Sequence, residues 1–235
     1  DEVILLVGTN SDWETEGNDR VDFNLPGEQN TLIEKVLEIN PNAIIVLNTG
    51  SPVDMPWVNK AKSILQSWYA GQEYGDALFE ILTGLVNPSG KLPTTFPKHI
   101  KDTPAYSCYP GENLQMSYDE KLLIGYKWYD RKKIEPLFHF GHGLSYTNFE
   151  YSNLRISNSD KNNFTCSFNI ENVGDISGFE ISQCYISFMN CDEDEPIKKL
   201  QGFDKTYINS GEIKKIEICL DSNSFSTWDI NNHQW

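Results

Sequence analysis

Long hydrophobic runs and an excess of basic charge are both absent from this sequence. A membrane-spanning helix needs about 20 mostly apolar residues, and the chain has no such run and opens on no signal peptide. It carries 19 lysine and arginine residues against 34 aspartate and glutamate residues, for a net charge of −15. This balance argues against nucleic acid or an anionic membrane surface as a partner, but it does not discriminate among neutral ligands.

Cysteine is scarce and forms no recognisable pattern. The cysteines are Cys108, Cys166, Cys184, Cys191 and Cys219. Their number is odd and their spacing is not that of a metal site, and the four histidines also lack ligand spacing. Cys166, Cys184 and Cys219 fall in strand-like stretches, where small buried residues are expected. The sequence therefore predicts no metal and no cofactor.

Two further absences narrow the function and leave the compartment open. The chain has neither a Gly-x-Ser-x-Gly nucleophile elbow nor a phosphate-binding loop. A glycosylation sequon at 163–165 would be used only in a secreted protein. No localisation is predicted, and the abrupt start close to a strand is what we expect of a fragment or a processed chain.

The first half of the chain repeats a strand–helix pattern. Strands are expected at residues 3–8, 43–48 and 63–69, and helices at 28–39, 57–61 and 74–83. Continuous apolar strands alternating with helices predict an α/β fold, with a mostly parallel sheet sandwiched by helices. A proline-rich and glycine-rich arm at 87–118 follows, and the aromatic segments 122–129 and 138–146 are expected to pack back on this domain.

The second half changes to a two-residue period. Apolar and polar residues alternate at 151–156, 163–169, 182–188 and 213–220, with turns rich in Asn, Asp, Ser and Gly between them. This pattern predicts a small antiparallel β-sandwich. We therefore expect an α/β domain with its connecting arm at 1–146 and an all-β domain at 147–235 that lacks a closing strand.

An acidic loop follows the first expected strand, at residues 11–20. It contains two glutamates, two aspartates, an arginine and a tryptophan. Ligands of open α/β sheets bind where the strands end. A carboxylic acid near an indole, followed by a glycine that permits close approach, suits general acid/base catalysis on a sugar. The alternative is a solvated acidic loop without chemistry.

Ordered motifs along the whole chain resemble glycoside hydrolase family three, the β-glucosidases and their relatives. In the first half they are Trp13-Glu-Thr-Glu-Gly-Asn-Asp-Arg20, Thr49-Gly-Ser-Pro-Val-Asp-Met-Pro-Trp57, Trp68-Tyr-Ala-Gly-Gln-Glu73, Asn87-Pro-Ser-Gly-Lys-Leu-Pro93 and Phe140-Gly-His-Gly-Leu-Ser-Tyr146. In the second half, residues 170–178 and 196–203 resemble that family's fibronectin type III-like module. The Trp-Glu-Thr-Glu-Gly form is similar to fungal and bacterial β-glucosidases that carry an inserted sugar-binding domain.

The resemblance implies a role for the acidic loop. In this family a nucleophilic aspartate comes from an amino-terminal (β/α)8 barrel, and the general acid/base glutamate comes from the loop that Glu16 matches. Trp13, Glu14 and Arg20 are candidate substrate-binding residues, and Glu14 is the second carboxylate to test. Asp19 and Arg20 are expected to pair and fix the loop. Asn18 departs from the family, which often has tyrosine there.

The barrel itself is missing from the sequence. The resemblance implies that the chain is part of a retaining exo-acting glycoside hydrolase, and that it is inactive without a barrel partner. The expected substrate is a β-linked glucoside or oligosaccharide, although xylosides, arabinosides and N-acetylglucosaminides also occur in the family. Two other readings stay open: a non-catalytic carbohydrate-binding or scaffolding module, and, more remotely, a doubly wound receiver domain.

Overall fold

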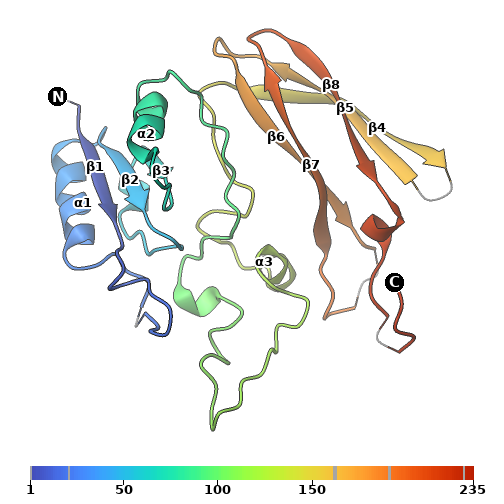
Figure 1. Cartoon of the computed structure of the whole chain (residues 1–235), viewed down its shortest axis with the longest axis horizontal. Coiled ribbons are helices and arrows are strands. Elements are labelled where there is room, and N and C mark those ends of the chain that lie inside the picture. Colours follow the sequence, from blue (N-terminus) through green and yellow to red (C-terminus); the bar gives the residue numbers. More distant parts are fainter. Residues whose placement is uncertain (1, 21, 161–162, 190–191, 230) are drawn as a thin grey trace.

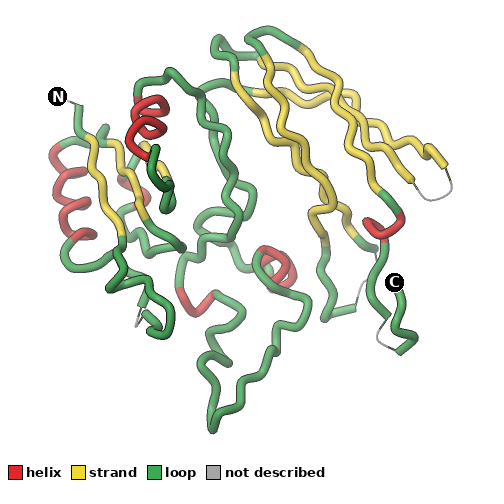
Figure 2. Tube along the Cα trace, in the orientation of Figure 1, coloured by secondary structure: helices red, strands yellow, loops and turns green. Residues whose placement is uncertain are grey.

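The computed structural model has an α/β part and a β-sandwich that lie side by side, joined by a long segment with little regular structure (Figures 1 and 2). The structure describes residues 2–20, 22–160, 163–189, 192–229 and 231–235. Cys191 lies outside these ranges. The longest helix within them has 11 residues, and none is long and apolar enough to cross a lipid bilayer.

Three parallel strands form the sheet of the α/β part, in the order β1-β2-β3. The elements of this part are β1 (Ile4–Gly8), α1 (Gln29–Ile39), β2 (Ile44–Asn48), β3 (Ser63–Gln66) and α2 (Tyr74–Leu82). Ile45, Val46 and Leu47 of the central strand β2 are all fully buried. Burial on both faces is typical of a parallel sheet. The α/β class predicted for this half is confirmed.

The core of the α/β part lies between α1 and the sheet. Ile33 and Leu37 lie one helical turn apart on α1 and share a hydrophobic cluster with Leu47. Trp57 is fully buried in the same cluster, and its indole N–H donates to Asn30 Oδ1 at 2.9 Å. Because the three strands are parallel, their carboxyl ends meet at one edge of the sheet.

Strand β3 is shorter than predicted. The apolar pattern predicts a strand at 63–69, but β3 ends at Gln66. Trp68 has a φ of 57°, in the left-handed region, which an extended strand cannot contain. The chain therefore leaves the sheet before Tyr69, and this residue becomes part of the loop at the sheet edge.

The connecting segment packs on the α/β part through aromatic side chains. Phe96 is almost completely buried, and its ring makes edge contacts with Trp68 and Phe138 at centroid distances of 6.0 and 6.1 Å. The segment contains a short 3-10 helix at Ile100–Asp102 and the helix α3 (Tyr126–Lys132). Helix α3 was not predicted, because its sequence was read only as an aromatic stretch.

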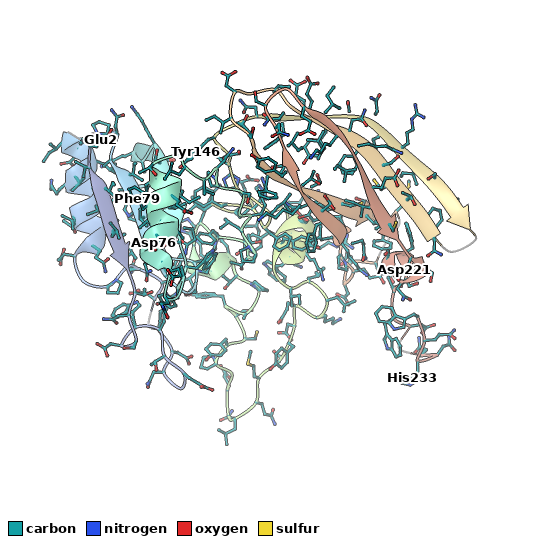
Figure 3. The ribbon with its side chains drawn as sticks, turned by 45° about the horizontal axis from the view of Figure 1, so that its top comes forward. Glu2, Asp76, Phe79, Tyr146, Asp221 and His233 are labelled. Carbon is teal, nitrogen blue, oxygen red and sulfur yellow. The ribbon has the colours of Figure 1, made fainter. Side chains whose placement is uncertain are left out.

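Hydrogen bonds connect the segment to both parts, and ion pairs connect it to the sandwich. Asn87 Oδ1 accepts from the Tyr146 N–H at 2.9 Å. Tyr146 lies beside α2 (Figure 3), and its hydroxyl donates to the Ile81 carbonyl at 2.8 Å. On the sandwich side, Lys91 Nζ lies 3.3 Å from Glu180 Oε2, and both side chains are largely buried. Asn87 Nδ2 also donates to the Ser177 carbonyl at 3.4 Å, so Asn87 and the Lys91–Glu180 pair are separate contacts to the sandwich.

The second half forms two packed antiparallel sheets. The strands are β4 (Phe149–Asp160), β5 (Asn163–Asn172), β6 (Gly178–Ser187), β7 (Lys198–Ile208) and β8 (Ile213–Leu220), followed by a 3-10 helix at Ser222–Phe225. One sheet has the order β4-β5-β8, and the other pairs β6 with β7. The predicted antiparallel sandwich is confirmed. Strand β7 was missed because its apolar residues do not alternate cleanly with polar ones.

One cysteine prediction is wrong. Cys166 is buried and Cys184 is half-buried, but Cys219 is exposed. Cys219 lies between Ile218 and Leu220, whose side chains point into the sandwich core. Successive residues of a strand face opposite sides, so Cys219 points away from that core.

Candidate functional site

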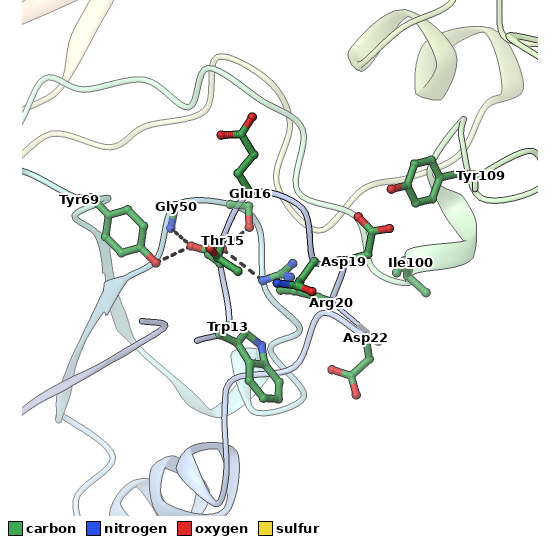
Figure 4. Close-up of a pocket in the computed structure, with 13 residues that line it drawn as sticks. Trp13, Thr15, Glu16, Asp19, Arg20, Asp22, Gly50, Tyr69, Ile100 and Tyr109 are labelled. Carbon is green, nitrogen blue, oxygen red and sulfur yellow. Dashed lines mark hydrogen bonds and ion pairs between the residues drawn. The ribbon is translucent and has the colours of Figure 1, made fainter. Parts of the chain in front are cut away.

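A cavity of about 600 Å³ lies at the edge of the sheet where the three strands end (Figure 4). Its lining comes from the loop after β1 (Trp13, Glu14, Thr15, Glu16, Asn18, Asp19, Arg20 and Asp22), from the segments after β2 (Gly50 and Ser51) and β3 (Tyr69), and from the connecting segment (Ile100 and Tyr109). All four sequence-predicted site residues therefore line one cavity. Its position matches the rule that open α/β sheets bind ligands at their carboxyl edge.

Glu16 presents an unengaged carboxylate at the rim of this cavity. Its side chain is exposed and extends away from the other labelled side chains (Figure 4). No residue that the structure describes forms a hydrogen bond or ion pair with this carboxylate. A bridge between Thr15 and Asn18 and the positive φ of Gly17, 83°, form the tight turn that holds Glu16 outward.

Glu14 is placed in the opposite way, with its carboxylate directed into the protein. Only 14% of its side chain is exposed. Its Oε2 accepts hydrogen bonds from Thr9 Oγ1 at 3.0 Å, from the Gly50 N–H at 2.8 Å and from the Tyr69 hydroxyl at 2.5 Å. These three donors follow β1, β2 and β3, so one oxygen connects the ends of all three strands.

The second oxygen of Glu14 binds Ser51 and Arg20. The Ser51 hydroxyl donates to Oε1, and Arg20 Nη1 lies 3.2 Å from the same atom. Arg20 Nη2 also donates to the Pro52 carbonyl at 3.2 Å. The expected pair between Asp19 and Arg20 is therefore wrong. Arg20 turns toward the partly buried Glu14 carboxylate, while Asp19 is exposed and lines the cavity together with Tyr109 of the connecting segment.

The hydrogen bonds change the pKa of both the Glu14 carboxyl and the Tyr69 hydroxyl. Burial by itself would raise the pKa of Glu14, but donation from Ser51, Tyr69, Gly50 and Thr9 outweighs burial and holds that pKa below its ordinary value. Burial and the hydrogen bond to the Glu14 carboxylate raise the pKa of Tyr69. Glu14 is therefore an anion that accepts hydrogen bonds, and Tyr69 is a neutral donor.

Trp13 lies between the loop and the cavity. Its side chain is partly buried, and its backbone N–H donates to the Asn10 carbonyl at 3.0 Å. The indole Nε1 is buried and has no acceptor among the residues that the structure describes. Trp13 thus lines the cavity, and its backbone hydrogen bond to Asn10 helps to fix the loop.

Several lining residues were not predicted from the sequence. Ser51 lies in a loop that was expected at the same sheet edge, so its position directly after β2 could have placed it at the site. Tyr69 was assigned to a strand, and only the early end of β3 brings it to the site. Ile100 and Tyr109 reach the cavity through the course of the connecting segment, for which the sequence has no periodic signal.

Family models match both halves of the chain. The model described as "Glycosyl hydrolase family 3 C-terminal domain" matches residues 1–146. The model described as "Fibronectin type III-like domain" matches residues 180–235. The family predicted from the loop motif is confirmed by these matches.

Relatives of known name align with the whole chain. The "Thermostable beta-glucosidase B" of Acetivibrio thermocellus is 42% identical over 238 residues, which cover 100% of this chain and 32% of that protein. The "Probable beta-glucosidase I" of Emericella nidulans is 40% identical over 243 residues, covering 100% of this chain and 29% of that protein. This chain thus spans about a third of the length of the curated relatives it matches.

Solved structures have the same fold. The β-glucosidase of Kluyveromyces marxianus in complex with glucose matches with a TM-score of 0.89 and 38% identity, over 94% of this chain and 27% of that one. The GH3 β-glucosidase of Bifidobacterium adolescentis matches with a TM-score of 0.95 and 33% identity, over 100% of this chain and 35% of that one. The chain belongs to glycosyl hydrolase family 3, of which it carries the C-terminal domain followed by a fibronectin type III-like domain.

Proposed function

We propose that this chain is the part of a retaining, exo-acting β-glucosidase that supplies the general acid/base, and that Glu16 is that residue. The observation that supports this most strongly is the contrast between the two loop glutamates. Glu14 is occupied by five donors, whereas Glu16 has a free carboxylate on the rim of the cavity. The relatives are named β-glucosidases, and one related structure contains glucose.

In the proposed reaction Glu16 first acts as an acid. It donates its proton to the glycosidic oxygen while an aspartate of an amino-terminal (β/α)8 barrel attacks the anomeric carbon. The bond to the leaving alcohol breaks, and a covalent glucosyl-enzyme forms. The Glu16 carboxylate then removes a proton from water, which attacks the anomeric carbon and releases glucose with retained configuration. This sequence places the two carboxyl groups about 5–5.5 Å apart.

The chain is proposed to be inactive by itself. It contributes one of the two carboxyl groups that a retaining mechanism uses, and Glu16 is exposed where it lines the cavity. A catalytic acid is normally kept protonated by burial near a second carboxylate. Docking of the barrel against the rim would supply both the nucleophile and that enclosure.

Trp13 is the cavity residue that we propose for contact with the leaving group, because an indole offers a broad apolar face to a sugar ring. The ion pair between Glu14 and Arg20 leaves both side chains engaged with protein atoms. These contacts favour a structural role for Glu14 and Arg20 over direct substrate binding.

The assignment of Glu16 is tested by leaving-group dependence. In a polypeptide that joins this chain to a family 3 barrel, Glu16→Gln should slow the cleavage of cellobiose by about 10²- to 10⁴-fold. A dinitrophenyl β-glucoside, whose leaving group needs no proton, should lose much less in the glucosylation step. Asp12→Asn is the matched control, since Asp12 is an exposed carboxylate of the same loop that does not line the cavity.

Two outcomes would count against the proposal. Unchanged cellobiose cleavage by the Glu16→Gln variant would remove Glu16 from the mechanism. Tight binding of cello-oligosaccharides to this chain alone, with no turnover when a barrel is added, would favour the carbohydrate-binding module instead. Isothermal titration and a coupled glucose assay distinguish the two readings.

A further inference from the structure

The Glu14 carboxylate lies at the base of the turn that carries Glu16. The turn runs from Thr15 to Asp19, directly between Glu14 and Arg20. The ion pair between Arg20 Nη1 and Glu14 Oε1, at 3.2 Å, therefore joins the residues on either side of the turn. Because the Arg20 guanidinium also binds the Pro52 carbonyl, the end of the turn is attached to the segment after β2 as well.

The same carboxylate attaches the start of the turn to the sheet. Its contacts to Thr9, Gly50 and Tyr69 each come from a segment that directly follows a different strand. The position of Glu16 relative to the sheet thus depends on one side chain two residues away. No comparable set of contacts is made by the turn itself among the described residues, since its own bridge joins only Thr15 to Asn18.

Only a carboxylate satisfies this set of contacts. Five donors converge on two oxygens, and an amide in place of one oxygen would direct its own N–H groups at a donor. Aspartate would be shorter by one methylene, so its oxygens could not reach all three strand ends. Gly50 is part of the same fit, because an added Cβ would lie 2.7 Å from Glu14 Oε2 and 2.8 Å from Tyr69 Cε2.

We infer that Glu14 is a positioning residue: through the strand-end contacts and Arg20, it holds the 15–19 turn so that Glu16 faces the barrel-borne nucleophile at the separation that retention needs. This inference rests on the proposed role of Glu16. It assigns Glu14 a role in the geometry of proton transfer, and no contact with the substrate.

The test uses Glu14→Gln and Glu14→Asp in the polypeptide that contains the barrel, with Asp12→Asn as the matched control. Both variants should lower kcat for cellobiose by about 10- to 100-fold, because a misplacement of about 1 Å costs roughly that much. The KM should change by less than about threefold, since no substrate contact is lost. Sodium azide should not restore the turnover of an aryl glucoside, because the Glu16 carboxylate is still present to exclude or repel the anion.

Two milder variants keep the inference testable if the Glu14 variants do not fold. Tyr69→Phe removes one donor without removing charge, and Gly50→Ala adds a methyl group that displaces the carboxylate. Both should show the same lowered kcat with little change in KM, with thermal melts showing that the protein is folded. A change confined to KM would instead make Glu14 a substrate contact, and full activity in all four variants would overturn the inference.

The result for Glu16 separates this inference from the proposed function. If Glu16→Ala is slow and is rescued by azide while the Glu14 variants are fully active, the acid/base assignment stands and the positioning role fails. If Glu14→Ala is rescued by azide and Glu16→Ala is fully active, the two roles are exchanged and both proposals fail.

Discussion

Arg20 pairs with Glu14 across the base of the turn and not with its sequence neighbour Asp19. The distance between Arg20 Nη1 and Glu14 Oε1 is 3.2 Å, and only 19% and 14% of the two side chains are exposed. Asp19 is exposed and lines the cavity. The loop after β1 is consequently held at the sheet edge, through Glu14 and Arg20.

The Arg20–Glu14 pair should contribute measurably to stability. Arg20→Met keeps an aliphatic side chain but leaves the Glu14 carboxylate without its charged partner, which should lower the free energy of unfolding by about 1–3 kcal/mol. Urea denaturation of this chain measures the loss. Lys35→Met is the control, because its pair with Glu38 is exposed on both sides and should be worth less than about 0.5 kcal/mol. Equal losses in the two variants would contradict the account.

The acidity of Glu14 predicts how stability depends on pH. Its pKa is lower in the folded protein than its ordinary value of 4.5, so the unfolded chain binds this proton more tightly. The stabilisation is therefore present above about pH 4.5 and is lost as the pH falls through the folded-state pKa. As the pH is lowered from about 7 to about 3, the melting temperature should fall more steeply for the natural sequence than for Glu14→Gln, because glutamine does not titrate. Parallel curves for the two proteins would show that Glu14 is not held as an anion.

The largely buried ion pair between Lys91 of the connecting segment and Glu180 of the sandwich gives a separate prediction. Lys91 and Glu180 are 16% and 13% exposed, so a double-mutant cycle with Lys91→Met and Glu180→Gln should give a coupling of about 1 kcal/mol or more. The exposed pair of Lys215 and Glu217 should give a coupling close to zero in the same experiment. A negligible coupling at Lys91 would mean that the pair does not help to hold the sandwich in place.

Thiol reactivity tests the burial assigned in the sandwich. Cys219 is exposed, whereas Cys166 is buried and burial raises the pKa of the Cys184 thiol to about 11. The thiolate is the reactive form, so Cys219 should react with an aromatic disulfide reagent faster than the other two. Removing it with Cys219→Ser should eliminate one rapidly reacting thiol, while Cys184→Ser should leave the rapid phase unchanged. If Cys219 reacted more slowly than Cys166 and Cys184, the residues of β8 would face the opposite sides of the sheet from those that the structure gives them.

The strands of the α/β part were predictable because their sequences are short apolar runs. Residues 44–47 are apolar without interruption, as is typical of a central parallel strand that is buried on both faces. Local patterns were less informative where a single backbone angle decides the outcome. The backbone of Trp68 is in the left-handed conformation, so β3 ends early, and the hydrophobic pattern does not predict this conformation. Strand β7 has the converse problem, since it pairs along its length with β6 although its sequence hardly alternates.

The candidate site was predictable in part. The loop motif and its resemblance to family three singled out Glu16, and the structure gives it an exposed position on the cavity rim. The role of Glu14 depends on donors 36, 37 and 55 residues away in sequence. Such contacts come from the packing of three strands, so the sequence near Glu14 does not reveal them. An Asp19–Arg20 pair was predicted because the two charges are adjacent in the sequence, whereas folding brings Arg20 to Glu14.

Trapping with azide is the most direct test of Glu16 as the proposed acid/base. Azide needs no general base, so it can attack the glucosyl-enzyme when the carboxylate of Glu16 is absent. Glu16→Ala joined to a family 3 barrel, given an aryl β-glucoside and sodium azide, should regain turnover and form β-glucosyl azide, identified by proton NMR. Absence of the azide product, together with undiminished cellobiose cleavage by the same variant, would contradict the account.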